Sequence, residues 1–137
     1  MIIRRAETKT FPILNCYGGT GAVVCREVLA DYDRTTAGFT LVHDDTLAPG
    51  VSVGEHRHVG DEEVYVILEG EGEMVVDGVV YAVGPGDVCV TRHGKTHGII
   101  RHTCGLHSTY WRTCRRCGRR PTRRGNECGP VLSGPTA

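Results

Sequence analysis

The sequence contains no apolar run that could cross a membrane, since no stretch approaches the roughly 18 apolar residues that a spanning helix requires. Its first residues, MIIRRAETKTF, also lack the apolar region of a secretory signal peptide. The glycine cluster at residues 17–21 fits neither GxGxxG nor GxxxxGKS/T, so a plain turn is favoured over a phosphate loop. Residues 1–37 show no helical periodicity that would supply a helix-turn-helix, which argues against a DNA-binding regulator. We therefore expect a cytoplasmic protein without a membrane anchor.

The 137 residues suit one domain, and a chain of this length can bury about two-thirds of the surface that its unfolded form exposes. Nineteen glycines and six prolines between short apolar runs are typical of an all-β domain. Residues 1–100 carry 8 Lys and Arg against 15 Asp and Glu (net −7), and residues 101–137 carry 8 Arg against 1 Glu (net +7). Seven cysteines, an odd number, indicate free thiols or metal ligands in a reducing compartment rather than disulfides.

Alternation of apolar and polar residues predicts a succession of short strands. Residues 1–21 are interpreted as a leader that ends in the glycine-rich turn, and strands are expected over residues 22–29 and 38–47. The dipeptide Asp77-Gly78 is a strong hairpin signal, and residues 87–91 and 97–101 should form a later pair of strands. Closely spaced strands with such turns predict a closed antiparallel barrel or jelly roll.

Histidines and carboxylates gather in the segment 50–70, GVSVGEHRHVGDEEVYVILEG. His56 and His58 are two residues apart, so on a strand both imidazoles point to the same face. Glu63 begins a second alternating run after a polar turn. Two neutral imidazoles and a carboxylate that converge inside a sheet are suited to a divalent metal. The plainer interpretation is a pair of surface histidines beside an acidic turn.

The same period of two assigns neighbouring residues to a face. Tyr65 shares the face of Glu63, and Ser52 shares that of His56, which would place its hydroxyl on a cavity wall. Glu62 is the alternative carboxylate, because a shift of one residue in the strand exchanges its two faces.

The spacing in this segment resembles the first motif of the cupin superfamily. The pattern is Gly50, five residues, His-x-His, four residues, Glu63, six residues and Gly70. All of the fixed positions of that motif match.

A second stretch, residues 86–97, resembles the second cupin motif after 15 intervening residues (71–85). Gly86, Gly94 and His97 match it, whereas Arg92 stands in place of a proline that normally stiffens the turn. His93 falls in that turn and is expected to be exposed and not a ligand. The chain is thus identified as a small single-domain cupin over about residues 22–101.

The resemblance implies an all-β fold: a single antiparallel β-barrel, or double-stranded β-helix of the jelly-roll type. It places the barrel at residues 1–111, with the motif core at 37–101, and implies one divalent metal (Mn, Fe, Co, Ni, Cu or Zn). A mixed nitrogen and oxygen shell does not select among these ions. Around an octahedral ion, four protein ligands would leave two positions for water, dioxygen or substrate oxygens. The implied ligands are His56, His58, Glu63 and His97.

Two functional hypotheses follow from the family, which includes dioxygenases, sugar isomerases, epimerases and decarboxylases as well as binding domains. In the first, the chain is an enzyme that acts on a sugar-like or oxygenated small molecule. The metal would act as a Lewis acid, and Tyr65 or His43 as proton donor or orienting group. In the second, it is a metal-dependent binding or sensory module without turnover. His43 also has a purely structural interpretation, as a hydrogen-bonded histidine. The partners expected are a small molecule and a second copy in a homodimer, and not a membrane or nucleic acid.

The resemblance ends at about residue 102. Residues 106–111 are expected to form at most a poor closing strand, and residues 112–137 a basic, cysteine-containing tail without regular structure, whose deletion would leave the metal site intact. A small zinc site is the alternative for this region. Its ligands would be Cys114, Cys117 and Cys128, with Cys104, His102 or His107 as the fourth. Nucleic-acid binding is disfavoured because Tyr110 and Trp111 are its only stacking aromatics.

Overall fold

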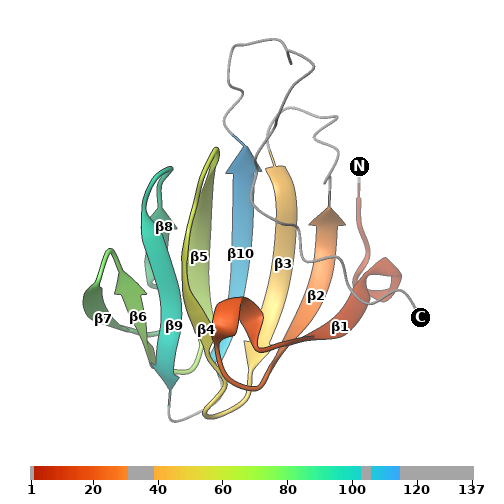
Figure 1. The fold of residues 1–137 in the computed structure, drawn as a ribbon. Coiled ribbons are helices and arrows are strands. Elements are labelled where there is room, and N and C mark those ends of the chain that lie inside the picture. Colours follow the sequence, from red (N-terminus) through yellow and green to blue (C-terminus); the bar gives the residue numbers. More distant parts are fainter. Residues whose placement is uncertain (1, 31–38, 103–105, 115–137) are drawn as a thin grey trace.

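The computed structural model describes residues 2–30, 39–102 and 106–114 (Figure 1). This part of the chain forms ten β-strands and two short 3-10 helices, η1 (Arg5–Glu7) and η2 (Cys16–Gly18), and contains no α-helix. None of its helices is long and apolar enough to cross a membrane. The strands are β1 (Lys9–Leu14), β2 (Ala22–Ala30), β3 (Phe39–Leu47), β4 (Val53–Arg57), β5 (Asp61–Glu69), β6 (Gly72–Val76), β7 (Val79–Val83), β8 (Val88–Thr91), β9 (Thr96–His102) and β10 (Leu106–Cys114).

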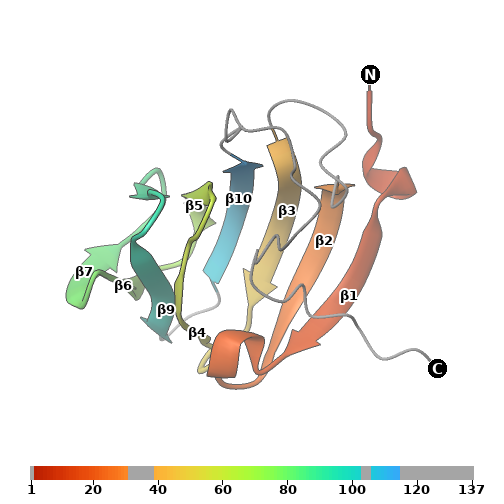
Figure 2. The ribbon, with the colours of Figure 1, turned by 45° about the horizontal axis from the view of Figure 1, so that its top comes forward.

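The strands belong to two antiparallel sheets. The larger sheet has the order β1-β2-β3-β10-β5-β8 and the smaller one the order β4-β9-β6-β7. Figures 1 and 2 show the strands β1, β2, β3, β10 and β5 side by side in this order, with most of the smaller sheet beyond β5. This arrangement confirms the expected all-β cupin jelly roll, although strand pairing within the described residues leaves two separate sheets and not a closed barrel.

The apolar core lies between the sheets and draws side chains from both. Leu47, Ile67 and Leu106 of the larger sheet are 0–1% exposed, as are Met74 and Ile99 of the smaller one. Because each sheet hides one apolar face against the other, the fold has an apolar core that does not depend on a bound ion.

Strand β5 shows how the local sequence selects the inner face. Its burial alternates along the strand, so Glu63, Tyr65 and Ile67 point inward while Val64 and Val66 are only partly buried. The predicted hairpin is also present: the turn between β6 and β7 has positive φ at Asp77 (49°) and Gly78 (76°).

The N-terminal segment is more than the leader that the sequence suggested. Strand β1 pairs along β2 and forms an edge of the larger sheet. Phe11 and Ile13 pack against the core from this strand. This strand contains Pro12, which is tolerated because an edge strand leaves one side without ladder partners.

Strand β10 differs most from expectation. The sequence indicated at most a poor closing strand over residues 106–111, but β10 lies between β3 and β5 inside the larger sheet. Hydrogen bonds to neighbours on both sides support it, and Leu106 at its start is fully buried. It extends to Cys114, and the remainder of the expected tail, residues 115–137, lies outside the described residues.

Candidate metal centre

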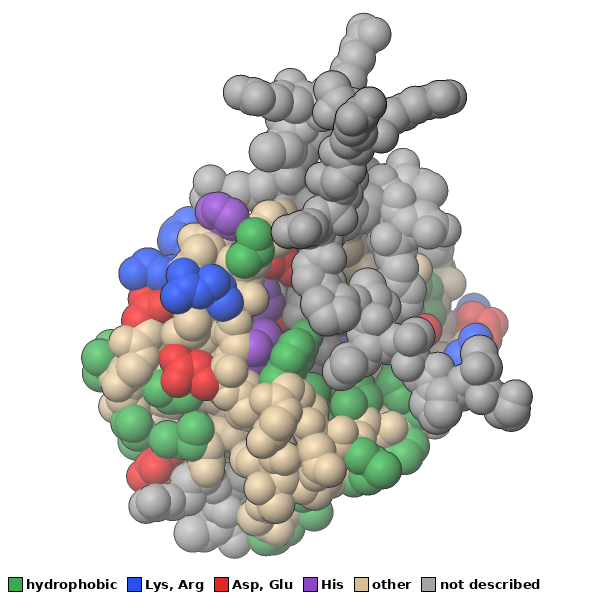
Figure 3. All heavy atoms as spheres, in the orientation of Figure 1, with side chains coloured by type: hydrophobic (Ala, Val, Ile, Leu, Met, Phe, Trp, Pro, Cys, Tyr) green, Lys and Arg blue, Asp and Glu red, His purple; other side chains and the backbone are tan. Residues whose placement is uncertain are grey.

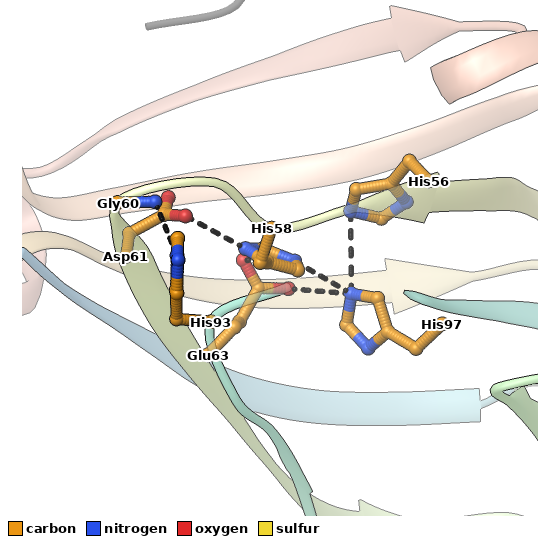
Figure 4. A network of polar contacts seen from close by, with 7 residues as sticks. All are labelled: His56, His58, Gly60, Asp61, Glu63, His93 and His97. Carbon is orange, nitrogen blue, oxygen red and sulfur yellow. Dashed lines mark hydrogen bonds and ion pairs between the residues drawn. The ribbon is translucent and has the colours of Figure 1, made fainter. Parts of the chain in front are cut away.

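Three strands bring four metal-ligand candidates together. His56 lies on β4, His58 directly follows that strand, Glu63 is on β5 and His97 is on β9. His56 and His97 are direct partners across the β4–β9 pairing, so residues 41 positions apart in sequence face each other. Figure 4 shows the three imidazoles and the carboxylate turned toward one another. Three of the four side chains are almost completely buried, at 1–2% exposed, and His56 is partly buried.

The distances between these groups suit one ion. Nε2 of His97 lies 3.1 Å from Nε2 of His58, 3.2 Å from Nε2 of His56 and 3.2 Å from Oε1 of Glu63. Nε2 of His58 lies 3.8 Å from Oε2 of Glu63. When two ligand atoms each lie about 2.1 Å from a metal ion and their bonds meet at a right angle, the two ligand atoms are roughly 3 Å apart. This is the separation seen around His97.

The ring nitrogens that face away from this point indicate where the lone pairs are. Nδ1 of His56 lies 3.0 Å from the carbonyl oxygen of Gly54, and Nδ1 of His58 lies 3.3 Å from Oδ1 of Asp61. Because both partners are acceptors, the Nδ1 atoms donate and the Nε2 lone pairs point inward. One proton on His97 could not satisfy two such lone pairs and a carboxylate at once. A cation would satisfy them all, so the donor set fits a divalent metal.

Burial lowers the pKa of His56 to about 4, and the neighbouring imidazoles of His97 and His58 act in the same direction. The hydrogen bond to Gly54 opposes this shift without cancelling it. His56 is therefore neutral at physiological pH, which is the state in which an imidazole binds a metal.

The structure resolves the choice between the two adjacent glutamates. Glu63 is 1% exposed on the inner face of β5, whereas Glu62 is on the other face and only partly buried. The register of β5 therefore leaves Glu63 as the carboxylate that meets the histidines.

Asp61 is a residue of this site that sequence reasoning missed. Its carboxylate holds Nδ1 of His58, the usual arrangement by which a carboxylate orients a metal-binding histidine. The sequence feature that could have identified Asp61 is its position three residues after His58, at the end of a tight turn. Hydrogen bonds hold this turn against the turn that precedes β9, from Gly94 N–H to the carbonyl of His58 (2.7 Å) and from His58 N–H to the carbonyl of Lys95 (3.0 Å).

Replacing Asp61 with alanine should weaken metal binding by roughly 10- to 100-fold, because the His58 ring would lose the group that selects its tautomer and orientation. The measurement is competition for cobalt against a chelator of known affinity. Glu62→Ala, one residue along and facing the opposite side, is the matched control and should bind as wild type does. An unchanged affinity in Asp61→Ala would show that His58 does not need this carboxylate.

The second cupin-like turn also differs in detail from expectation. His93 is exposed, as predicted, but its Nδ1 accepts a hydrogen bond from Gly60 N–H (2.8 Å), which ties the two turns together. The corner in which Arg92 replaces the proline is closed by a hydrogen bond from Lys95 N–H to the carbonyl of Arg92 (3.0 Å). The hydroxyl of Ser52, expected on the cavity wall, instead accepts a hydrogen bond from Thr20 N–H (2.8 Å).

The two residues predicted to assist chemistry lie on the inner face, at different places. Tyr65 is 5% exposed, and its ring centroid is 5.2 Å from that of His97, near the T-shaped geometry. His43 on β3 is 3% exposed, and its Nδ1 lies 3.8 Å from Oδ1 of Asp45. Tyr65 therefore borders the four-ligand cluster, and His43 belongs to a second interior group.

That second group, Cys25, His43 and Asp45, also has metal-ligand chemistry. Burial, reinforced by the charge of Asp45, holds the pKa of the Cys25 thiol far above its usual range, and the thiol donates to Asp45. Metals bind the thiolate, so this group is better described as a buried hydrogen-bonded pair beside a histidine. Burial also raises the pKa of Asp45 to about 7. The zinc site suggested for Cys104, Cys114, Cys117 and Cys128 with a histidine lies outside the described side chains.

Comparison with known proteins agrees with this geometry. A cupin domain model matches residues 44–104. A curated relative, the oxalate-binding protein of Thermotoga maritima, is 36% identical over 99 residues, which cover 72% of this chain and 81% of the relative.

Solved structures give the same result. A predicted oxalate decarboxylase from Thermotoga maritima superposes with a TM-score of 0.75 at 32% identity, over 83% of this chain and 99% of that one. The polyketide cyclase RemF from Streptomyces resistomycificus superposes with a TM-score of 0.65 at 22% identity, over 85% and 81% of the two chains, which shows the shared fold alone. With both motifs in place on a jelly roll, this chain belongs to the cupin domain family.

Proposed function

We propose that this protein binds one divalent transition metal through His56, His58, Glu63 and His97. The observation that supports this most strongly is the convergence of three imidazole Nε2 atoms and one buried carboxylate, with contacts of 3.1–3.2 Å at His97. When bound, such an ion supplies a Lewis acid that can hold and polarise ligand oxygens.

We further propose that the metal-loaded site takes a small oxygen-chelating anion of the oxalate class. Three neutral imidazoles, one carboxylate and a divalent cation sum to a charge of +1, which favours an anion over a neutral molecule. The near-complete burial of three ligands favours a small one. Two matches above 30% identity, both from Thermotoga maritima, carry oxalate in their names, as an oxalate-binding protein and as a predicted oxalate decarboxylase.

A catalytic role is the second candidate, as an isomerase, epimerase, dioxygenase or decarboxylase for an oxygenated small molecule. The observation that favours it is the presence of proton-carrying groups on the inner face that metal binding does not require. Tyr65 borders His97, and His43 lies beside Asp45, whose pKa of about 7 suits proton exchange at neutral pH. In this proposal Tyr65 or His43 donates a proton to the ligand or orients it.

The test is calorimetric titration of oxalate into the purified protein, metal-free and loaded with manganese or cobalt. Oxalate should bind only to the loaded protein, and roughly tenfold or more tightly than acetate, because one oxygen from each of its two carboxylates can bind the ion without the strain of a single chelating carboxylate. Glu63→Gln should lose metal and oxalate together, whereas the adjacent Glu62→Gln should behave as wild type. Oxalate binding that survives a chelator would contradict the proposal.

The same samples separate binding from catalysis. Loaded protein is incubated with oxalate, and separately with sugars and enediols, with and without oxygen, and products are followed by NMR. Turnover that is lost in Tyr65→Phe or His43→Gln, with oxalate affinity retained, supports the enzyme. Binding without turnover of any of these compounds supports the binding module.

A further inference from the structure

The phenol ring of Tyr17 lies flat against the imidazole of His56. The ring centroids are 3.7 Å apart and the planes differ by 6°, a face-to-face stack. Tyr17 belongs to η2, well before the matched cupin domain at residues 44–104. It therefore reaches the metal centre from a part of the chain that neither cupin motif includes.

His56 is the ligand that most needs support. His58, Glu63 and His97 are 1–2% exposed and enclosed by the two sheets, while His56 is only partly buried. Figure 3 shows histidine side chains at the surface of the molecule. A partly buried ligand has fewer neighbours to hold its ring, so a covering side chain has a larger effect on it than on a ligand in the interior.

The loop that carries Tyr17 is attached closely to β4. A Cβ atom at Gly54 would overlap the carbonyl oxygen of Tyr17, and one at Gly19 would overlap the carbonyl oxygen of Ser52. Only glycine at these two positions lets the two backbones approach so closely. The loop is also tied by hydrogen bonds in both directions, from Thr20 N–H to the Ser52 hydroxyl (2.8 Å) and from Ser52 N–H to the Thr20 carbonyl (2.9 Å).

Tyr17 adopts a backbone conformation that is costly for its residue type. Its φ of 49° and ψ of 35° lie in the left-handed region, where glycine is at ease and an aromatic residue is not. Gly18 (79°) and Gly21 (76°) of the same loop also have positive φ, but glycine adopts such values without the cost that tyrosine meets. A strained backbone conformation beside a cluster of candidate metal ligands suggests that the side chain of this residue has a functional role.

We infer that Tyr17 is a positioning residue for the metal centre, holding the His56 imidazole so that its Nε2 faces the other three ligands. The ring has two restraints: its Nδ1–H donates to the Gly54 carbonyl (3.0 Å), and its face is covered by the phenol. Together they oppose rotation of a half-open side chain, and Nε2 stays 3.2 Å from Nε2 of His97. This inference rests on the proposed metal-binding function.

The experiment compares Tyr17→Ala, Tyr17→Phe and Tyr17→Leu with wild type by cobalt affinity, measured against a competing chelator. Loss of the stack should weaken cobalt binding roughly 3- to 10-fold in the alanine and leucine variants. Phenylalanine keeps the aromatic face and should stay within about twofold of wild type. Tyr81→Ala, at a comparably exposed tyrosine on β7 (52% against 43% for Tyr17), is the matched control and should bind as wild type does.

A second readout follows the His56 ring without metal. Nitrogen-15 NMR of the metal-free protein should show a single tautomer at His56, with the proton on Nδ1, in wild type and Tyr17→Phe. In Tyr17→Ala or Tyr17→Leu the signal should become an average of two tautomers. A merely structural role for Tyr17 would lower thermal stability without changing this tautomer.

Equal cobalt affinity and an unchanged His56 tautomer in Tyr17→Ala would overturn the inference. So would a Tyr17→Phe variant as weak as the alanine one, since the hydroxyl rather than the stack would then matter. If Tyr17→Ala fails to fold, the comparison of phenylalanine with leucine decides. If wild type takes up no cobalt, the proposed function fails, and the metal-free tautomer measurement still tests the role of Tyr17.

Discussion

Replacing His58 with alanine is expected to abolish metal binding and to leave the metal-free protein about as stable as metal-free wild type. His58 supplies one of four converging donor atoms, 3.1 Å from Nε2 of His97, and its loss opens the shell. Even loss of a supporting group beyond the ligands typically costs 10- to 100-fold, so loss of a ligand should exceed about 100-fold. The apolar core spans both sheets without an ion, in contrast to a zinc finger, which folds only with its metal.

The decisive measurement is the melting temperature with metal and with chelator. Wild type should gain stability on metal addition, by about 2.7 kcal/mol when free metal is 100 times the dissociation constant, and His58→Ala should gain none. In chelator the two should melt within about 5 °C of each other. His93→Ala, at the exposed histidine of the neighbouring turn, should retain metal binding. An unfolded metal-free protein would move this chain to the class whose metal is structural.

We compare the free energy of unfolding of metal-free Asp45→Asn with that of metal-free wild type. The variant should be more stable relative to wild type at pH 8 than it is at pH 5. Burial raises the pKa of Asp45 to about 7, above the value near 3.8 that it has when unfolded. Between these two values the folded state binds more protons than the unfolded state, so stability falls as pH rises, and the loss is complete above pH 7. About two pH units of this interval lie between pH 5 and pH 7, so at about 1.4 kcal/mol per unit the ceiling for this comparison is roughly 3 kcal/mol, and we expect on the order of 1–2 kcal/mol.

The difference between the two proteins is the quantity to measure, by urea denaturation at pH 5 and pH 8 in chelator. His56, whose folded pKa is lowered to about 4, makes stability rise with pH up to about 6.5 in both proteins, so its contribution cancels. Asp44→Asn is the matched control, because that carboxylate is on the outer face near Arg5 (3.7 Å) and Arg26 (3.6 Å). The charge of Asp44 is only a minor cause of the raised pKa of Asp45, so the effect of Asp44→Asn should change with pH much less than that of Asp45→Asn. An Asp45→Asn effect that does not change with pH would show that Asp45 is ionised without penalty.

Much of the inner face could be predicted from residue order alone. The alternation through β5 assigned Glu63 and Tyr65 to one side, and the two-residue spacing assigned His56 and His58 to one side of the preceding strand, because strand side chains alternate regardless of what they meet. The hairpin at Asp77-Gly78 followed from backbone preferences of two residues. The conformational preferences of neighbouring residues are sufficient to predict features of this kind.

Sequence order left the partners of each strand undecided. The interpretation of residues 1–21 as a leader missed β1, because Pro12 weakens a strand signal and only the sheet shows that this strand is an edge. The poor closing strand became β10, whose place between β3 and β5 depends on hydrogen bonds to segments far away in the chain.

By itself, then, the sequence determined the strand period, the two cupin motifs and the four candidate ligands, because each depends on spacing within a few residues. Tertiary structure alone decided that His97 meets His56 across β4 and β9, and it excluded the one-residue shift of β5 that would have turned Glu62 inward. It alone brought Tyr17 onto His56. The physical reason is that such contacts join segments about 40 residues apart, and their formation depends on packing of two whole sheets rather than on the preferences of neighbouring residues.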